Sequence, residues 1–176
     1  MKDGDNVVFF KHKKFLDGRG WLANINPRDF IDKHAEPFVH SFISYSLKNT
    51  LRGFHFQEPP YEQAKIVHVI AGSILDVSFS LDSEENRPIC VASVLGDGTE
   101  FDTVFLGARM AHAFLVLSDS ATLLYLNSSE YCEKYAKSIN PIDPDIGFDW
   151  GVARESLILS ERDAQAISWS DYLTWI

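Results

Sequence analysis

Ionisable side chains stand in or beside apolar segments of this sequence, and they are the residues that could carry chemistry. They are Arg52, His55, Lys65, His112 and Asp163. An imidazole takes up and releases protons near neutral pH, whereas lysine and arginine stabilise negative charge. Because a charge inside a fold is costly unless it is paired, these residues indicate a shared polar site.

Each of these residues, taken alone, has an ordinary explanation. A histidine on a strand is most often packed or solvated, and a lysine at a strand start is most often solvated. Strand residues separated by an even number share a face, which places Gly53, His55 and Gln57 on one face and Arg52 on the other. A bulge is therefore required if Arg52 and His55 are to line the same cavity.

The elements that must position these residues are short strands separated by turn signals rich in Gly, Pro, Asn and Asp. A hairpin is predicted around the turn 17–20, a short helix is predicted to begin at Asn26 and Pro27, and short helical or irregular pieces follow Ser128. Many short strands at regular spacing indicate a sandwich or barrel. The predicted strands are 7–10, 38–45, 50–57, 66–71, 73–81, 89–95, 103–106, 113–117 and 122–127.

Length and composition agree with a β protein. The chain has 176 residues, which suits a single domain over residues 1–176 with one sizeable core. Aromatic residues make up 13% of the chain and include thirteen Phe. Aromatic enrichment favours strands over helices, so the sequence predicts an all-β fold.

The net charge and the composition of the segments limit the kinds of partner that the protein is expected to bind. The formal net charge of −9 argues against nucleic acid and against an anionic membrane, since both require a basic surface. The N-terminal residues lack the apolar stretch of a signal peptide, and no apolar run reaches transmembrane length, so we expect a cytoplasmic protein. Cys90 and Cys132 have no metal-type spacing and are expected to be reduced thiols.

Five motifs stand in order at residues 51–57, 63–67, 72–77, 111–118 and 159–163. They resemble those of the dTDP-4-dehydrorhamnose 3,5-epimerase family, with Ala113 where the family usually has glycine. The resemblance as a whole covers about residue 17 to residue 163. It implies a cupin-type jelly-roll β-barrel with short peripheral helices, usually a homodimer.

The resemblance also implies catalytic roles. His55 would be the general base with Asp163 as its partner, and Tyr125 would be the general acid on the opposite face of the sugar. Lys65, together with His112, would stabilise the enolate oxygen. This chemistry needs no metal and no redox cofactor, because removing a proton beside a ketone requires only a base and a donor to the oxygen.

The same resemblance implies a nucleotide-diphosphate sugar as substrate, with a 4-keto-6-deoxyhexose inverted at carbon 3, at carbon 5 or at both. The enzyme would serve deoxysugar biosynthesis for a surface polysaccharide or a glycosylated metabolite. Arginine forks suit phosphate, and an aromatic ring offers a face to the base. The implied substrate-binding residues are Arg19, Arg52, His112, Gln57, Tyr131, Asn24 and His40.

The departures from the family pattern fall at positions that are expected to contact the nucleotide. Asn24 stands near the usual position of a Glu, while His40 and Phe42 replace Gln and Asn on the strand before the core motif. These changes suggest a dTDP-linked or a CDP-linked substrate.

Three alternatives stay open from the sequence alone. A metal-dependent cupin would use His55, Gln57, Glu62 and His112, which loosely follow the usual order of ligands. A sugar-nucleotide binder on the same scaffold would not need catalysis, and a sugar ketoisomerase could use a related barrel.

Overall fold

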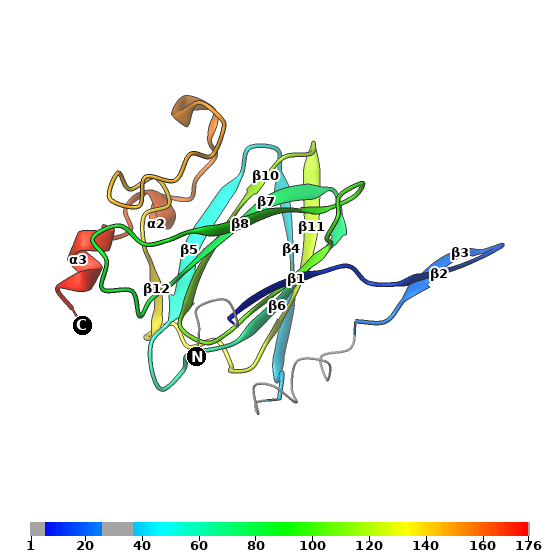
Figure 1. Ribbon diagram of the computed structural model, residues 1–176, viewed down its shortest axis with the longest axis horizontal. Coiled ribbons are helices and arrows are strands. Elements are labelled where there is room, and N and C mark those ends of the chain that lie inside the picture. The colour runs from blue at the N-terminus through cyan, green and yellow to red at the C-terminus, as the bar shows by residue number, and fades with distance from the viewer. Residues whose placement is uncertain (1–5, 26–36, 176) are drawn as a thin grey trace.

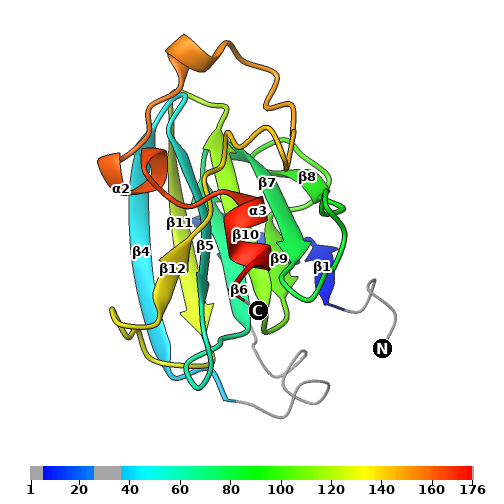
Figure 2. The same cartoon turned by 90° about the vertical axis from the view of Figure 1, so that its left-hand side faces the viewer.

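The computed structural model describes residues 6–25 and 37–175, and these residues form a β-sandwich of two sheets packed face to face (Figure 1, Figure 2). All strand pairs are antiparallel. The predicted all-β, jelly-roll class is therefore confirmed.

The first sheet has the order β1 (Val7–Phe10), β9 (Thr103–Leu106), β6 (Lys65–Ala71), β11 (Ser120–Asn127) and β4 (His40–Leu47). The second has the order β12 (Ala136–Ser138), β5 (Leu51–Gln57), β10 (Met110–Val116), β7 (Ser73–Ser80) and β8 (Val91–Gly96).

An apolar core fills the space between the sheets at one end of the sandwich. Val67 and Leu123 from the first sheet pack with Ile74 and Val116 from the second. Along each of these strands the alternate residues point outward, as the pleat requires. The core therefore closes one end and leaves polar side chains to line the other.

A one-residue bulge in β5 decides which side chains enter the space between the sheets. His112 pairs with His55, but Phe114 pairs with Arg52, so three steps along β5 match two along β10. The extra residue turns Arg52 and His55 to the same side, and the predicted bulge is confirmed. Gly53 has φ +131°, and a Cβ there would lie 2.3 Å from the Cβ of Ala113.

The C-terminal segment covers the outer face of the second sheet (Figure 2). It contains a 3₁₀ turn (Arg154–Ser156) and the short helices α2 (Glu161–Ala164) and α3 (Trp169–Leu173). Trp169 and Tyr172 are buried there against Phe79 and Phe56 of the sheet. This packing holds α2 beside β5 and so fixes the position of Asp163.

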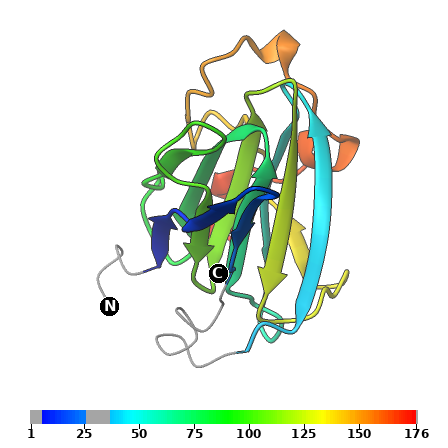
Figure 3. The same cartoon turned by 90° about the vertical axis from the view of Figure 1, so that its right-hand side faces the viewer.

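A hairpin of β2 (Lys14–Asp17) and β3 (Gly20–Ala23) extends away from the two sheets in Figure 1 and lies in front of them, toward the viewer, in Figure 3. It confirms the predicted turn at residues 17–20. The helix predicted to begin at Asn26 and Pro27 lies outside the described residues. Among the described residues, no helix has the length and apolar character needed to span a membrane.

Candidate active site

A cavity of about 240 Å³ lies between the two sheets, beyond the end of the apolar core. A second hollow of about 150 Å³ adjoins it, because Phe42, His55 and Lys65 line both. Strands from both sheets contribute side chains, so the site depends on the packing of the whole sandwich. The larger cavity is lined by Phe42, Ser44, Arg52, His55, Gln63, Lys65, His112, Phe114, Tyr125 and Asn127.

His55 forms a close pair with a carboxylate from the C-terminal segment. Its Nε2 lies 2.6 Å from Oδ1 of Asp163, whose side chain is buried while 43% of the His55 side chain remains exposed. Burial alone would raise the pKa of Asp163, but the hydrogen bond and charge of His55 outweigh it and keep this pKa below its usual value. An ionised carboxylate in this place orients the imidazole and stabilises its protonated form. The expected hydrogen-bond contact between the two residues is confirmed.

Lys65 places a poorly solvated ammonium group beside the histidine. It is the first residue of β6, and its Nζ donates to the backbone oxygen of His55 at 3.2 Å. Burial lowers the pKa of Lys65 to about 8. No salt bridge to Lys65 occurs among the described residues. The charge is thus available to an anion that develops in the cavity.

A second histidine–carboxylate pair lies deeper in the cavity wall. Nε2 of His112 is 2.6 Å from Oδ2 of Asp76, and both side chains are buried. Oδ1 of Asp76 has no hydrogen-bond partner among the described residues. Asp76 was not predicted as a site residue, although a carboxylate within the apolar segment 74–77 breaks the same rule that drew attention to His55.

Tyr125 lines the cavity from the sheet opposite His55, as expected. Its ring stacks on Phe42 with 4.3 Å between centroids and 10° between planes. Burial raises the pKa of the phenol well above its usual value, so the group is protonated at neutral pH. A base from one sheet and a protonated phenol from the other therefore border the same space.

A family model described as dTDP-4-dehydrorhamnose 3,5-epimerase matches residues 3–171. The chain belongs to this family. A dTDP-4-dehydrorhamnose 3,5-epimerase from Mycobacterium tuberculosis is 35% identical over 163 residues, which cover 89% of this chain and 79% of the relative. Membership makes the chain an isomerase, and it confirms the resemblance on which the catalytic roles were predicted.

Solved structures of the family agree with the fold. The M. tuberculosis rmlC epimerase superimposes with a TM-score of 0.86 at 27% identity, covering 99% of this chain and 90% of that one. A 3′-monoepimerase from Streptomyces bikiniensis, solved with dTDP-quinovose, gives a TM-score of 0.80 at 31% identity and covers 94% and 84% of the two chains.

The remaining predicted contacts of this epimerase divide between the two hollows. Arg52 lines the larger one, and its Nε donates to Oγ of Ser46 at 2.9 Å. His40 and Tyr131 line the adjoining hollow. Gln57 lines it too, but its amide is hydrogen-bonded to backbone groups of three loop residues, so its polar atoms hold loops in place.

Two predicted contacts do not reach the cavity of their own chain. Arg19 lies at the tip of the hairpin, where 91% of its side chain is exposed and Asp17 is its ion-pair partner at 2.6 Å. Asn24 is exposed just after β3. Because the hairpin extends away from the sheets, Arg19 and Asn24 line neither hollow of their own chain, and their predicted contact with substrate stays a prediction.

Several residues that line the two hollows were not predicted from the sequence. Asn127 shares a face of β11 with Tyr125, and this even spacing could have identified it. Lys137 and Arg162 add two cations to the adjoining hollow. Arg162 belongs to the motif that contains Asp163, whereas Lys137 stands in a segment with no apolar pattern.

The metal-cupin alternative is not supported by the donor groups. His55 and His112 each direct Nε2 to a separate carboxylate at 2.6 Å, and the amide of Gln57 is engaged by backbone groups. Within residues 6–25 and 37–175, the one group of three or more potential metal ligands is His12, His68 and Asp102, which does not line the cavity.

Proposed function

We propose that the cavity between the sheets binds a nucleotide-linked 4-keto-6-deoxyhexose and inverts carbon 3, carbon 5 or both by moving protons. The catalytic residues would be His55, Asp163, Lys65 and Tyr125. The observation that carries this proposal is the His55–Asp163 pair, which borders one cavity with the protonated phenol of Tyr125 on the opposite sheet.

The reaction begins with proton abstraction beside the ketone. The imidazole of His55 takes the proton, and the electron pair of the broken C–H bond moves toward the ketone oxygen to give an enolate. Asp163 stabilises the imidazolium that forms. Lys65 supplies positive charge to the enolate oxygen in a site with little water, where such charge is most effective.

Inversion requires a proton from the other face of the sugar. Tyr125 donates its phenolic proton to the carbon, and the enolate returns to the ketone. The phenolate then takes up a proton from solvent, and the imidazolium of His55 releases one to solvent. Each positioned acid or base contributes roughly 10²–10⁴-fold to the rate. The non-catalytic binder is disfavoured because His55, Lys65 and Tyr125 line one cavity and Asp163 is paired with His55.

Cations in the adjoining hollow suit the diphosphate of the substrate. Lys137 and Arg162 lie there with Tyr131, whose ring offers a face for the nucleobase, and Arg52 lies in the larger cavity. The dTDP-linked ligand of the S. bikiniensis relative supports a dTDP sugar as first choice. A CDP sugar is the alternative, because His40 and Phe42 line the hollow where the family has amides.

The working form would be a homodimer of single-domain chains in the cytoplasm. The hairpin exposes Phe15, Leu16, Trp21 and Leu22, and Leu16 is 81% exposed. An apolar surface of this kind marks an interaction site. Packing against a second copy would cover it and would bring Arg19 toward the partner's cavity.

The direct test is proton NMR in deuterated water with dTDP-4-keto-6-deoxyglucose and, in parallel, its CDP counterpart. We expect deuterium to enter at carbon 3, carbon 5 or both with one nucleotide, and the exchange to be lost in His55→Ala. Weak binding of both substrates and no exchange would contradict the proposal.

A further inference from the structure

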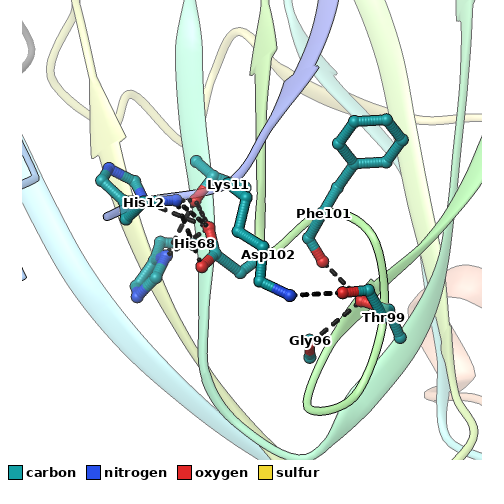
Figure 4. Close-up of polar contacts among 8 residues, drawn as sticks. Lys11, His12, His68, Gly96, Thr99, Phe101 and Asp102 are labelled. Atoms are coloured by element: carbon teal, nitrogen blue, oxygen red, sulfur yellow. Dashed lines mark hydrogen bonds and ion pairs between the residues drawn. The ribbon is translucent and has the colours of Figure 1, made fainter. Parts of the chain in front are cut away.

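Two histidines and an aspartate converge on the outer face of the first sheet, away from both hollows (Figure 4). His68 lies in β6 between Val67 and Val69, which both pack into the core, so its side chain points to the opposite face. His12 follows β1, and Asp102 immediately precedes β9. Three segments distant in sequence therefore meet at this cluster, and the epimerase mechanism uses none of its residues.

The donor atoms lie close enough together to share one metal ion. Nδ1 of His12 lies 3.1 Å from Oδ1 of Asp102, and Nδ1 of His68 lies 3.8 Å from the same oxygen. The donor atoms of the three residues all lie within 4.8 Å of one another. Around tetrahedral zinc with ligands at ~2.0–2.1 Å, neighbouring ligand atoms are about 3.3–3.4 Å apart. The two observed distances bracket this value.

The cluster is enclosed and has an outer hydrogen-bond partner. The side chains of His12 and His68 are each 8% exposed, and that of Asp102 is 5% exposed. The hydroxyl of Thr103 donates to Oδ1 of Asp102 at 2.8 Å and lies within 2.9 Å of both Nδ1 atoms. Such a partner orients a ligating carboxylate.

We propose that His12, His68 and Asp102 form a structural site for a divalent transition metal, with Zn²⁺ as the first choice and the fourth position open to water. Two imidazoles and one carboxylate favour zinc, cobalt or nickel over magnesium and calcium, which prefer oxygen ligands. The ion would tie the segment after β1, which leads into the hairpin, to β6 and β9. The site is separate from catalysis.

Zinc titration of untagged, chelator-treated protein tests the proposal. We expect calorimetry to give one Zn²⁺ per chain with a dissociation constant on the order of micromolar or below. At free zinc 100-fold above this constant, the folding equilibrium constant should rise about 100-fold, seen as a higher melting temperature. Cobalt should give the intense visible absorption of tetrahedral coordination.

Variants separate this site from the catalytic cavity. His68→Asn and Asp102→Asn should each weaken zinc binding at least ~100-fold, and Thr103→Val should weaken it roughly 10–100-fold. His55→Asn, in the cavity, should bind zinc as the parent does. If Asp102→Asn fails to fold, His12→Ala keeps the test intact, because His12 lies outside the strands.

Two results would overturn the assignment. One is the absence of stoichiometric zinc binding by the parent protein, which would leave the cluster as a hydrogen-bonded clamp only. The other is zinc binding that survives in His68→Asn and His12→Ala. The epimerase proposal is unaffected by either result, since deuterium exchange is measured independently of zinc.

Discussion

At the scale of single residues, the pairing of each histidine with its own carboxylate separates the functions of His55 and His112. The ring of His55 is partly exposed to the cavity, whereas His112 and Asp76 are both buried. A general base must be exposed to the cavity to reach the substrate, whereas a group that donates to the enolate oxygen can be largely buried in the cavity wall. This contrast supports His55 as the base and His112 as a donor beside Lys65.

Asp163→Asn keeps the size of the side chain and removes the charge that stabilises protonated His55. We expect the exchange rate to fall roughly 10²–10⁴-fold with little change in KM, because the loss is felt as the imidazolium forms. Asp119→Asn is the matched control, since that aspartate is exposed and away from the cavity. An unchanged rate in Asp163→Asn would remove the dyad from the mechanism.

Lys65 gives the reaction a predicted alkaline limit. Burial lowers its pKa to about 8, so the ammonium is present below this pH and is lost as the pH rises through it. The rate of deuterium exchange should therefore decline above about pH 8. Lys65→Arg keeps its charge at high pH and should move this decline upward, while Lys65→Met should lose roughly 10²–10³-fold at neutral pH. An identical alkaline decline in Lys65→Arg would assign it to another group.

At the scale of elements, the bulge of β5 is the feature on which the site depends. Gly53→Ala would place a Cβ 2.3 Å from that of Ala113 at φ +131° and should cost roughly 2–5 kcal/mol of unfolding free energy. Gly98→Ala is the control, because Gly98 also has positive φ but no atom within 4 Å of its Cβ position, and should cost about 1 kcal/mol. Urea denaturation measures both, and equal losses would contradict the packing argument.

The sequence predicts strands where period-two patterns are strong, and the differences occur where long-range contacts decide. β10 begins at Met110, three residues before the predicted start, because residues of mixed character there are buried between β5 and β7. β12 was missed, since Ala136–Ser138 has no apolar pattern and depends on pairing with β5. The same limit hid Lys137, whereas the His55–Asp163 contact was predicted from the family motifs.

At the scale of the whole molecule, the two sheets contribute different catalytic side chains to the site. The first sheet supplies Lys65 and Tyr125, and the second supplies His55 and His112. Neither sheet alone assembles an acid and a base across a gap. The extended hairpin adds a third part. Its apolar side chains are exposed, and Arg19 forms its ion pair with Asp17 of the same hairpin.

Mixing two variants of impaired activity tests whether the hairpin completes the site of a second copy. Arg19→Ala lowers activity in every cavity if Arg19 acts in the partner, and His55→Ala abolishes it. In a heterodimer of the two, the cavity with intact His55 also receives an intact Arg19, so activity should return. Random pairing yields half heterodimers, each with one complete site, so about a quarter of the parental rate is expected.

The control for this experiment is Leu16→Asp, which places a charge on the exposed apolar surface of the hairpin. It should shift the protein from twice the chain mass of 19.9 kDa to a single chain in sedimentation, with the sheets still folded, because β2 and β3 pair only with each other. Added to both variants, it should prevent the recovery of activity. If Arg19 acts within its own chain instead, mixing restores no activity even in the dimer, because neither chain carries both residues intact.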